Sequence, residues 1–143
     1  MAHTAKLFGR IYLSLANKEI DLDADSLKLM LCTSAYTPDQ DAHQYKSSVT
    51  NEVTGTGYTA GGKALENVAV TYDPATNALI LDADDVSWAA STLTARHAVL
   101  YDDTPATNKP LLGFVTFESD ISSTSAPFQV IWNASGILRI AAS

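Results

Sequence analysis

TNEVTGTGYTAGGKALENVAVTY, residues 50–72, is the stretch that decides the fold, because it fits either a phosphate-binding loop or a loop that leads into a β-strand. Gly57, Gly62 and Lys63 have the spacing of the phosphate-binding pattern G-x-x-x-x-G-K-[ST]. Ala64 stands where that pattern needs a Ser or Thr hydroxyl to bind Mg²⁺. The pattern also needs a helix directly after the loop, whose N-terminus would bind the phosphates. The required hydroxyl is absent, so the choice between a phosphate-binding loop and a loop before a strand depends on the residues that follow.

The residues after the loop indicate a strand. Within residues 64–72, Val68, Val70 and Tyr72 place β-branched and aromatic side chains on alternate positions, which is the period of a half-buried strand. The glycines also lack the spacing of the dinucleotide-binding pattern G-x-G-x-x-G. We therefore predict that the glycines allow positive-φ turns and close approach of a neighbouring segment, and that the loop binds no nucleotide.

The same period of two recurs along most of the chain. Strand-like runs occupy residues 6–15, 26–33, 78–82, 95–101, 110–117, 126–132 and 137–141. Turn or loop compositions occupy residues 73–77, 102–109, 118–125 and 133–136. About eight short strands at this spacing predict an all-β fold, with a single domain over residues 1–143 that is either an antiparallel β-sandwich or a jelly-roll-like barrel.

Residues 36–52, YTPDQDAHQYKSSVTNE, form the one segment without a clear period. Pro38 and Asp39 suit the start of a short helix, so we expect a long surface loop that contains one helical turn. Long loops in compact domains often carry function. We therefore regard residues 36–62 as a candidate docking surface.

Composition excludes several classes of protein. Hydrophobic residues make up 46% of the 143 residues and charged residues 17%, which excludes a disordered chain. Nine basic and sixteen acidic residues give a net charge of −7, and no basic cluster offsets it, so we expect no direct binding to nucleic acid. No apolar run has the length of a membrane helix and the start lacks the pattern of a signal peptide, so we expect no membrane partner.

Two groups of aspartates are candidates for cation binding or acid–base chemistry. Asp21, Asp23 and Asp25 have the spacing of the first ligands of an EF-hand, but Ser26 replaces the glycine of that loop and Cys32 replaces its bidentate glutamate. We therefore expect a solvated acidic turn.

The second group is split between two segments. Asp82, Asp84 and Asp85 lie at the end of the strand-like run over residues 78–82, and Asp102 and Asp103 follow the run over residues 95–101. Two carboxylates that converge could exchange protons or bind a hard cation. Since aspartate is also common at strand ends, where it bonds to turn backbone, we expect the structural role.

The remaining reactive side chains are isolated in the sequence. His3, His43 and His97 form no metal-binding pair, and Cys32 is the only cysteine, in a strand-like run that favours burial. The side chains that could stack on a sugar are Trp88 and Trp132, although packing in the core is the simpler role. We therefore predict no catalytic residue, no cofactor and no metal. The first five residues and residues 141–143 are short segments without charged side chains and could pair with a neighbour's sheet edge.

Five segments resemble small virion structural proteins of tailed bacteriophages and prophages. The segments are LCTSAYTPDQDAH (residues 31–43), VTNEVTGTGYTAGG (49–62), VTYDPATN (70–77), ADDVSWAAS (83–91) and FQVIWNASGI (128–137). The resemblance covers about residues 27–140. It implies a non-enzymatic, all-β component of a virus particle, made in the cytoplasm of a bacterial host, and it transfers no catalytic residue.

Within that family we expect a capsid decoration, or cement, protein on the outer surface of the head. Its partners would be the major capsid protein and copies of itself, with a homotrimer suggested by analogy. The alternative is a subunit associated with the tail or its fibres. A carbohydrate-binding module that uses Trp88 or Trp132 is a third hypothesis, from a different functional class.

Overall fold

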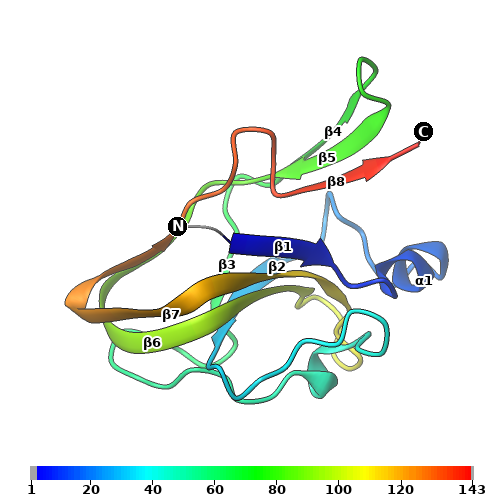
Figure 1. Cartoon of the computed structure of the whole chain (residues 1–143). Coiled ribbons are helices and arrows are strands. Elements are labelled where there is room, and N and C mark those ends of the chain that lie inside the picture. The colour runs from blue at the N-terminus through cyan, green and yellow to red at the C-terminus, as the bar shows by residue number, and fades with distance from the viewer. Residues whose placement is uncertain (1–2, 143) are drawn as a thin grey trace.

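The computed structural model describes residues 3–142, except for the side chains of His3 and Thr4. Strands account for 48% of the chain and helix for 7%, in two antiparallel sheets. The prediction of an all-β fold with about eight strands is therefore confirmed. Figure 1 shows the smaller sheet lying over one side of the larger one, with the hairpin of β4 and β5 extending beyond it.

The larger sheet has five strands in the order β1-β7-β6-β2-β3. Their bounds are His3–Leu7 for β1, Leu111–Val130 for β7, Val86–Asp102 for β6, Leu27–Cys32 for β2 and Lys63–Ala64 for β3. β6 and β7 form a long bent ribbon whose pairing is interrupted by register shifts, which are typical of strands that bend. Edge strand β1 pairs only with β7, so its other edge is unpaired within the sheet.

The smaller sheet has three strands in the order β4-β5-β8. They span Ala69–Asp73, Ala78–Asp82 and Leu138–Ala141. The predicted turn at residues 73–77 joins β4 to β5, and Asn77 adopts a positive φ of 52° there, as asparagine often does in turns. β8 is the edge strand on the side of β1, so that one edge of each sheet borders the same side of the molecule (Figure 1).

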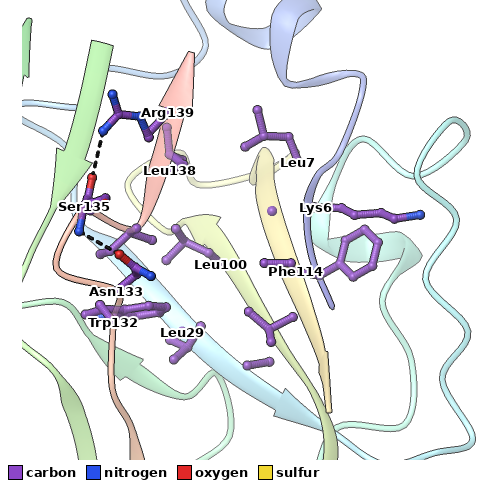
Figure 2. A pocket seen from close by; sticks show the side chains of 16 residues that line it. Lys6, Leu7, Leu29, Leu100, Phe114, Trp132, Asn133, Ser135, Leu138 and Arg139 are labelled. Atoms are coloured by element: carbon purple, nitrogen blue, oxygen red, sulfur yellow. Dashed lines mark hydrogen bonds between the residues drawn. The ribbon is translucent and has the colours of Figure 1, made fainter. Parts of the chain in front are cut away.

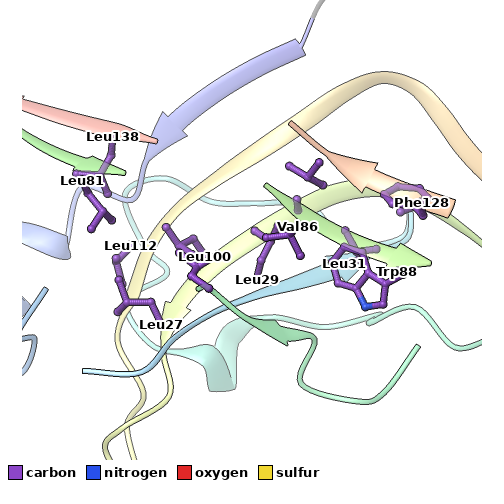
Figure 3. Close-up of a cluster of buried hydrophobic side chains, with 14 of the residues drawn as sticks. Leu27, Leu29, Leu31, Leu81, Val86, Trp88, Leu100, Leu112, Phe128 and Leu138 are labelled. Atoms are coloured by element: carbon purple, nitrogen blue, oxygen red, sulfur yellow. The ribbon is translucent and has the colours of Figure 1, made fainter. Parts of the chain in front are cut away.

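The main core lies between the two sheets. β2 contributes Leu27, Leu29 and Leu31 from one face, and Leu81 and Leu138 come from the smaller sheet. Figure 3 shows these side chains pointing toward one another, together with Trp88 and Phe128 farther along the ribbon. The alternation of leucines in the sequence therefore marks the face of β2 that packs against the other sheet.

A second, smaller cluster packs on the opposite face of the larger sheet. It includes Met30 and Cys32 of β2, together with Tyr36 from the loop that covers them. This loop contains the 3₁₀ turn η1 (Lys46–Ser48), so the prediction of a long loop with one helical turn over residues 36–52 is confirmed, although the turn begins at Lys46 and not at Pro38 or Asp39. Both faces of β2 are therefore buried.

One predicted strand is wrong. Residues 6–15 do not form a single strand: β1 ends at Leu7, and helix α1 spans Ile11–Ala16. The N–H of Gly9 donates to the carbonyl of Gln40 at 2.8 Å, which takes the chain away from the sheet. In the helix, Ile11 and Ser14 are buried, three residues apart, as expected for the inner face of a helix.

One predicted loop is also wrong, because residues 118–125 lie inside β7. Their serine hydroxyls bond across the ladder to β6: Ser122 to Thr94 at 2.7 Å, and Ser123 to Ser91 at 2.7 Å. Such cross-strand hydroxyl pairs stabilise a sheet. Residues with a composition typical of loops therefore form part of a strand here.

The predicted strand over residues 64–72 is divided between the sheets. β3 pairs with β2 in the larger sheet, whereas β4 pairs with β5 in the smaller one. Asn67, with a φ of 53°, lies in the connection between them. The chain changes sheets here, which one continuous strand could not do.

The chain ends differ from the expected free arms. His3–Leu7 pairs with β7 as strand β1, and Ala141 pairs with Ala78. These residues are therefore held in the protein's own sheets. Met1, Ala2 and Ser143 lie outside the described residues.

Candidate functional site

The glycine-rich loop packs directly against two strands of the larger sheet. Gly57 and Gly62 both have a φ of +81°, a conformation that favours glycine. A Cβ added to Gly57 would lie 2.4 Å from the carbonyl oxygen of Ala90, and one added to Gly62 would lie 2.0 Å from that of Leu29. These two glycines therefore serve close backbone packing, as the sequence predicted.

The polar groups of this loop are engaged within the protein. The N–H of Gly61 donates to both carboxylate oxygens of Glu52, at 2.8 and 2.9 Å. The hydroxyl of Tyr101 donates to the carbonyl of Gly61 at 2.6 Å. Lys63 donates through Nζ to the carbonyl of Ser87 on β6. A carboxylate of the same chain thus binds the amide of Gly61, and the lysine that would reach a phosphate fastens β3 to β6.

The acidic run at residues 21–25 forms a turn whose carboxylates bond to its own backbone, and the Asp25 carboxyl also lies near Asp102. Oδ1 of Asp21 accepts hydrogen bonds from the N–H groups of Asp23 and Ala24, both at 3.1 Å. Oδ2 of Asp25 accepts from the N–H of Asp21 at 2.9 Å. Carboxylates bonded in this way stabilise the turn, which agrees with the structural role predicted for them.

The second group of aspartates is not brought together. Asp85 directly precedes β6 and Asp102 ends it, so the two pairs of carboxylates lie at opposite ends of a 17-residue strand. Asp84 accepts a hydrogen bond from Asn67 Nδ2 at 2.6 Å, and Asp85 accepts from the N–H of Trp132 at 2.9 Å. Among the described residues, no three His, Cys, Asp or Glu side chains are placed to bind a metal ion together.

The turn after β6 holds one unusual carboxyl group. Asp102 is completely buried, and burial, together with the nearby Asp25 carboxyl, raises its pKa to about 7. Oδ1 accepts from the N–H of Thr104 at 2.9 Å, whereas Oδ2 has no hydrogen-bond partner in the described part of the chain. Its neighbour Asp103 forms ion pairs with Lys28 and Lys109, both at 3.0 Å.

The predicted histidine and cysteine candidates are on the covered face of the larger sheet. Nδ1 of His43 bonds to the hydroxyl of Tyr36 at 3.0 Å, and Nδ1 of His97 bonds to that of Thr116 at 3.0 Å. Burial lowers the pKa of His97 and raises the pKa of the Cys32 thiol to about 12. Cys32 is therefore a buried thiol, as predicted. The side chain of His3 is not among those described.

The two tryptophans have different environments. Trp88 is 4% exposed and meets Phe128 edge to face, so its ring has no open face for a sugar. Trp132 is half-buried, and its indole N–H donates to the carbonyl of Asp84 at 3.0 Å. Of the two, only Trp132 borders an open hollow.

That hollow is the feature that the sequence did not predict. Two adjoining apolar cavities of about 430 and 520 Å³ lie between the face of the larger sheet, from β1 inward, and the segment over residues 131–139 that ends in β8, and we call them together the β1–β8 groove. Figure 2 shows Leu29 and Leu100 in the groove, with Leu138 on the side of the smaller sheet. No Asp or Glu lines either cavity.

Small residues open the groove. Ala5, Ala98 and Gly113 line the first cavity, where larger side chains would fill it. Beside the second cavity, Ile131 is 69% exposed. Large exposed aliphatic side chains beside an apolar hollow are typical of an interaction surface. In the sequence, this surface is marked only by two adjacent large apolar residues, Ile131 and Trp132, next to a turn. The same pattern fits a buried core equally well.

No helix of the described residues is long and apolar enough to cross a membrane. No protein-family model, no curated protein and no solved structure matches the chain significantly.

Proposed function

We propose that this chain is a non-enzymatic structural protein of a tailed-bacteriophage virion. Specifically, it is a capsid decoration protein that binds the outer surface of the major capsid lattice and stabilises the head. The resemblance of residues 27–140 to small virion proteins supports this proposal. Its partners are then the major capsid protein and further copies of itself, assembled as a homotrimer.

The observation that carries the proposal is the contrast between the candidate catalytic or metal-binding side chains and the β1–β8 groove. Lys63, Glu52, Asp21, Asp25, Asp84 and Asp85 bond to the protein's own backbone or to its own side chains. The groove is apolar, open and bordered by strand edges, which are features of surfaces that bind other proteins. These features support a role in binding another protein.

The charge and the repeating target support the same role. A net charge of −7 on an outer layer keeps particles apart in solution. Contacts that are weak one by one become strong when several copies bind neighbouring positions of one lattice. A small acidic protein with one apolar groove can therefore cover a capsid without a large interface for each copy.

Copy number tests the proposal. Particles are purified by density gradient from a host that carries the gene, and the chain is quantified by mass spectrometry against the major capsid protein. The expected result is a copy number comparable to that of the major capsid protein. A few copies per particle, found only in purified tails, would reject decoration in favour of a subunit of the tail or fibre. Absence from particles would reject both.

A further inference from the structure

One of the four edge strands differs from the other three. β1, β3 and β8 each contain one basic residue, namely Lys6, Lys63 and Arg139. Charged side chains on an edge strand, above all lysine, discourage pairing with the edge of another molecule. β4 has the sequence AVTYD, with Asp73 at its last position as its one charge, and its pairing with β5 has no register shift. Among the edge strands of residues 3–142, β4 is therefore the one without such protection.

The free edge of β4 carries the backbone groups of Val70 and Tyr72. The carbonyl of Asn77 accepts a hydrogen bond at 2.7 Å from the N–H of Ala142, which directly follows β8. The N–H of Ala78 belongs to the same peptide group as that carbonyl, so it points the opposite way, toward β4. Backbone groups of an antiparallel strand alternate in direction, so the register of β4 with β5 leaves the N–H and C=O groups of Val70 and Tyr72 pointing away from β5.

The same two residues supply the apolar side chains of this edge. Val70 packs against the main core, whereas Tyr72 is 58% exposed. Their side chains lie on one face of the sheet, because they are two positions apart in a strand. Figure 1 shows the hairpin of β4 and β5 extending beyond the larger sheet, with β4 as its outer strand. A strand added here would therefore meet free backbone groups and an exposed aromatic ring.

One antiparallel register pairs all of these free groups with those of a second β4. With Val70 opposite Tyr72 of the other copy, the two strands form four N–H···O=C bonds around a twofold axis at Thr71. A shift of two residues toward the turn would place Val70 opposite Pro74, which has no N–H. A shift in the other direction would place Tyr72 opposite Val68, which lies before the strand. The symmetric register is thus the favoured one.

In that register the strand is complementary to itself. The ring of Tyr72 lies beside the β-branched side chain of Val70 from the other copy, and such cross-strand pairs stabilise a sheet. Asp73 lies opposite Ala69, so the two Asp73 carboxylates do not oppose each other. A second copy of a chain with a net charge of −7 can therefore pair here without like charges opposed across the axis.

We propose that two copies of this chain associate through their β4 strands, in the antiparallel register centred on Thr71. The contact joins two three-stranded sheets into one sheet of six strands. β1 is a poorer partner strand for β4. The carbonyl of Leu7 on its outer edge already accepts a hydrogen bond from the side-chain amide of Gln40 at 2.8 Å, because the N–H of Phe8 in the same peptide group points to β7.

The β4 contact goes beyond the proposed function. A twofold contact is complete with two copies, so it cannot by itself form the homotrimer proposed above. It would instead join one copy from each of two trimers. The contact therefore predicts assemblies with an even number of copies, either dimers or pairs of trimers.

Sedimentation equilibrium of the purified whole chain tests the contact. The natural chain should form a dimer, or a hexamer if trimers also form. Tyr72→Pro removes the N–H that points outward, and proline is tolerated at such an edge position. We expect a twofold lower molar mass for this variant. Tyr72→Ala is the matched control, because it removes the ring and retains the N–H, so it should weaken the assembly less. A natural chain that remains a monomer or a trimer at its highest soluble concentration would overturn the proposal.

An exchange of charge at the axis tests the register. Thr71 lies opposite itself, so Thr71→Lys brings two ammonium groups together and should raise the dissociation constant by up to about fivefold. Thr71→Glu should do the same with two carboxylates. An equimolar mixture of the two variants pairs opposite charges and should restore the natural affinity. If the mixture associates no better than either variant alone, the proposal is wrong, even if Tyr72→Pro does not fold.

The outcome for the contact is independent of the particle experiment. A chain that pairs through β4 but is absent from virions retains the contact and loses the proposed function. A chain that is abundant on heads, but whose assembly does not respond to the charge exchange, loses only the contact.

Discussion

In the glycine-rich loop the polar groups are bonded within the protein and the space is filled, whereas the β1–β8 groove is open and apolar. The loop carries a sequence close to a binding motif, yet its backbone touches β2 and β6 and the N–H of Gly61 is bound by Glu52. The groove carries no motif, yet it is hollow and is bordered by unpaired strand edges. In this protein, the open apolar space lies at the groove, and the loop that resembles a motif is filled by the protein's own groups.

This difference shows that a short sequence motif does not determine which groups a loop binds. Spacing of glycine and lysine fixes which residues are neighbours along the chain, but the bonding partner of a loop depends on the rest of the fold. Here Glu52 and Tyr101 come from separate segments and together occupy both backbone groups of Gly61. Substitutions that affect one region and leave the other unchanged can test this comparison.

The largest effect is expected in the glycine-rich loop. Gly62→Ala adds a Cβ 2.0 Å from the carbonyl oxygen of Leu29 at a φ of +81°, so the backbone must move. We expect a loss of about 3 kcal/mol in the free energy of unfolding, measured by urea titration. Gly9→Ala is the matched control, because its Cβ would meet its nearest neighbour at an ordinary 3.4 Å. Equal losses in both variants would show that the loop is not tightly packed.

The buried carboxyl of Asp102 makes the stability of the fold depend on pH in a way that can be tested. Its pKa is raised from 3.8 to about 7 in the folded protein, so the folded state binds more protons than the unfolded state between these pH values. This contribution to stability is full below pH 3.8 and is lost as the pH rises through 7, with a slope of at most about 1.4 kcal/mol per pH unit.

Asp102→Asn removes that titration and retains the shape of the side chain. The stability of this variant relative to the natural chain should therefore rise as the pH increases from 4 to 7, as measured by urea titration at several pH values. The comparison cancels the opposite trend from His97, whose lowered pKa makes the fold less stable as the pH falls through 6.5. A difference that does not vary with pH would contradict the raised pKa.

A smaller effect is expected from the bond between Tyr101 and the loop. Tyr101→Phe removes only the hydroxyl that donates to the carbonyl of Gly61 at 2.6 Å. We expect a loss of about 1 kcal/mol in the free energy of unfolding. Tyr12→Phe is the control, because Tyr12 is 54% exposed. If the two variants are equally stable, the hydroxyl of Tyr101 does not anchor the loop.

The smallest effect on stability is expected beside the groove. Ile131→Ser changes a side chain that is 69% exposed, so the free energy of unfolding should remain within about 0.5 kcal/mol of the natural value. Binding to particles should nevertheless weaken, as measured by co-sedimentation with heads that lack the chain. Unchanged co-sedimentation would remove this side of the groove from the docking surface.

Much of the fold could be predicted from periodicity. The alternation of leucines in β2 gave its inward face correctly, and the turn at residues 73–77 lies between β4 and β5 as expected. The errors arose where one pattern fits two structures. Ile11 and Ser14 are buried on a helix because Gly9 leads the chain away from the sheet, and Ser122 and Ser123 lie in a strand because hydroxyls on β6 bond to them.

The groove could not be predicted, because it depends on the spacing of two sheets. Ala5, Ala98 and Gly113 are ordinary strand residues in the sequence, and only the pairing of β1 with β7 and β6 places them together. The candidate side chains were easier to judge. Asp21 and Asp25 bond to the backbone of their own turn, as the sequence predicted, whereas Asp84 and Asp85 bond to Asn67 and Trp132, which are distant in the sequence.

A cryo-EM map of the purified virion tests the central claim most directly, because it locates the chain and its groove together. The account predicts density for the chain on the outer surface of the head, in numbers comparable to the major capsid protein, with the β1–β8 groove in contact with a capsid subunit. Density confined to the tail, or a head-bound chain with its groove open to solvent, would contradict it.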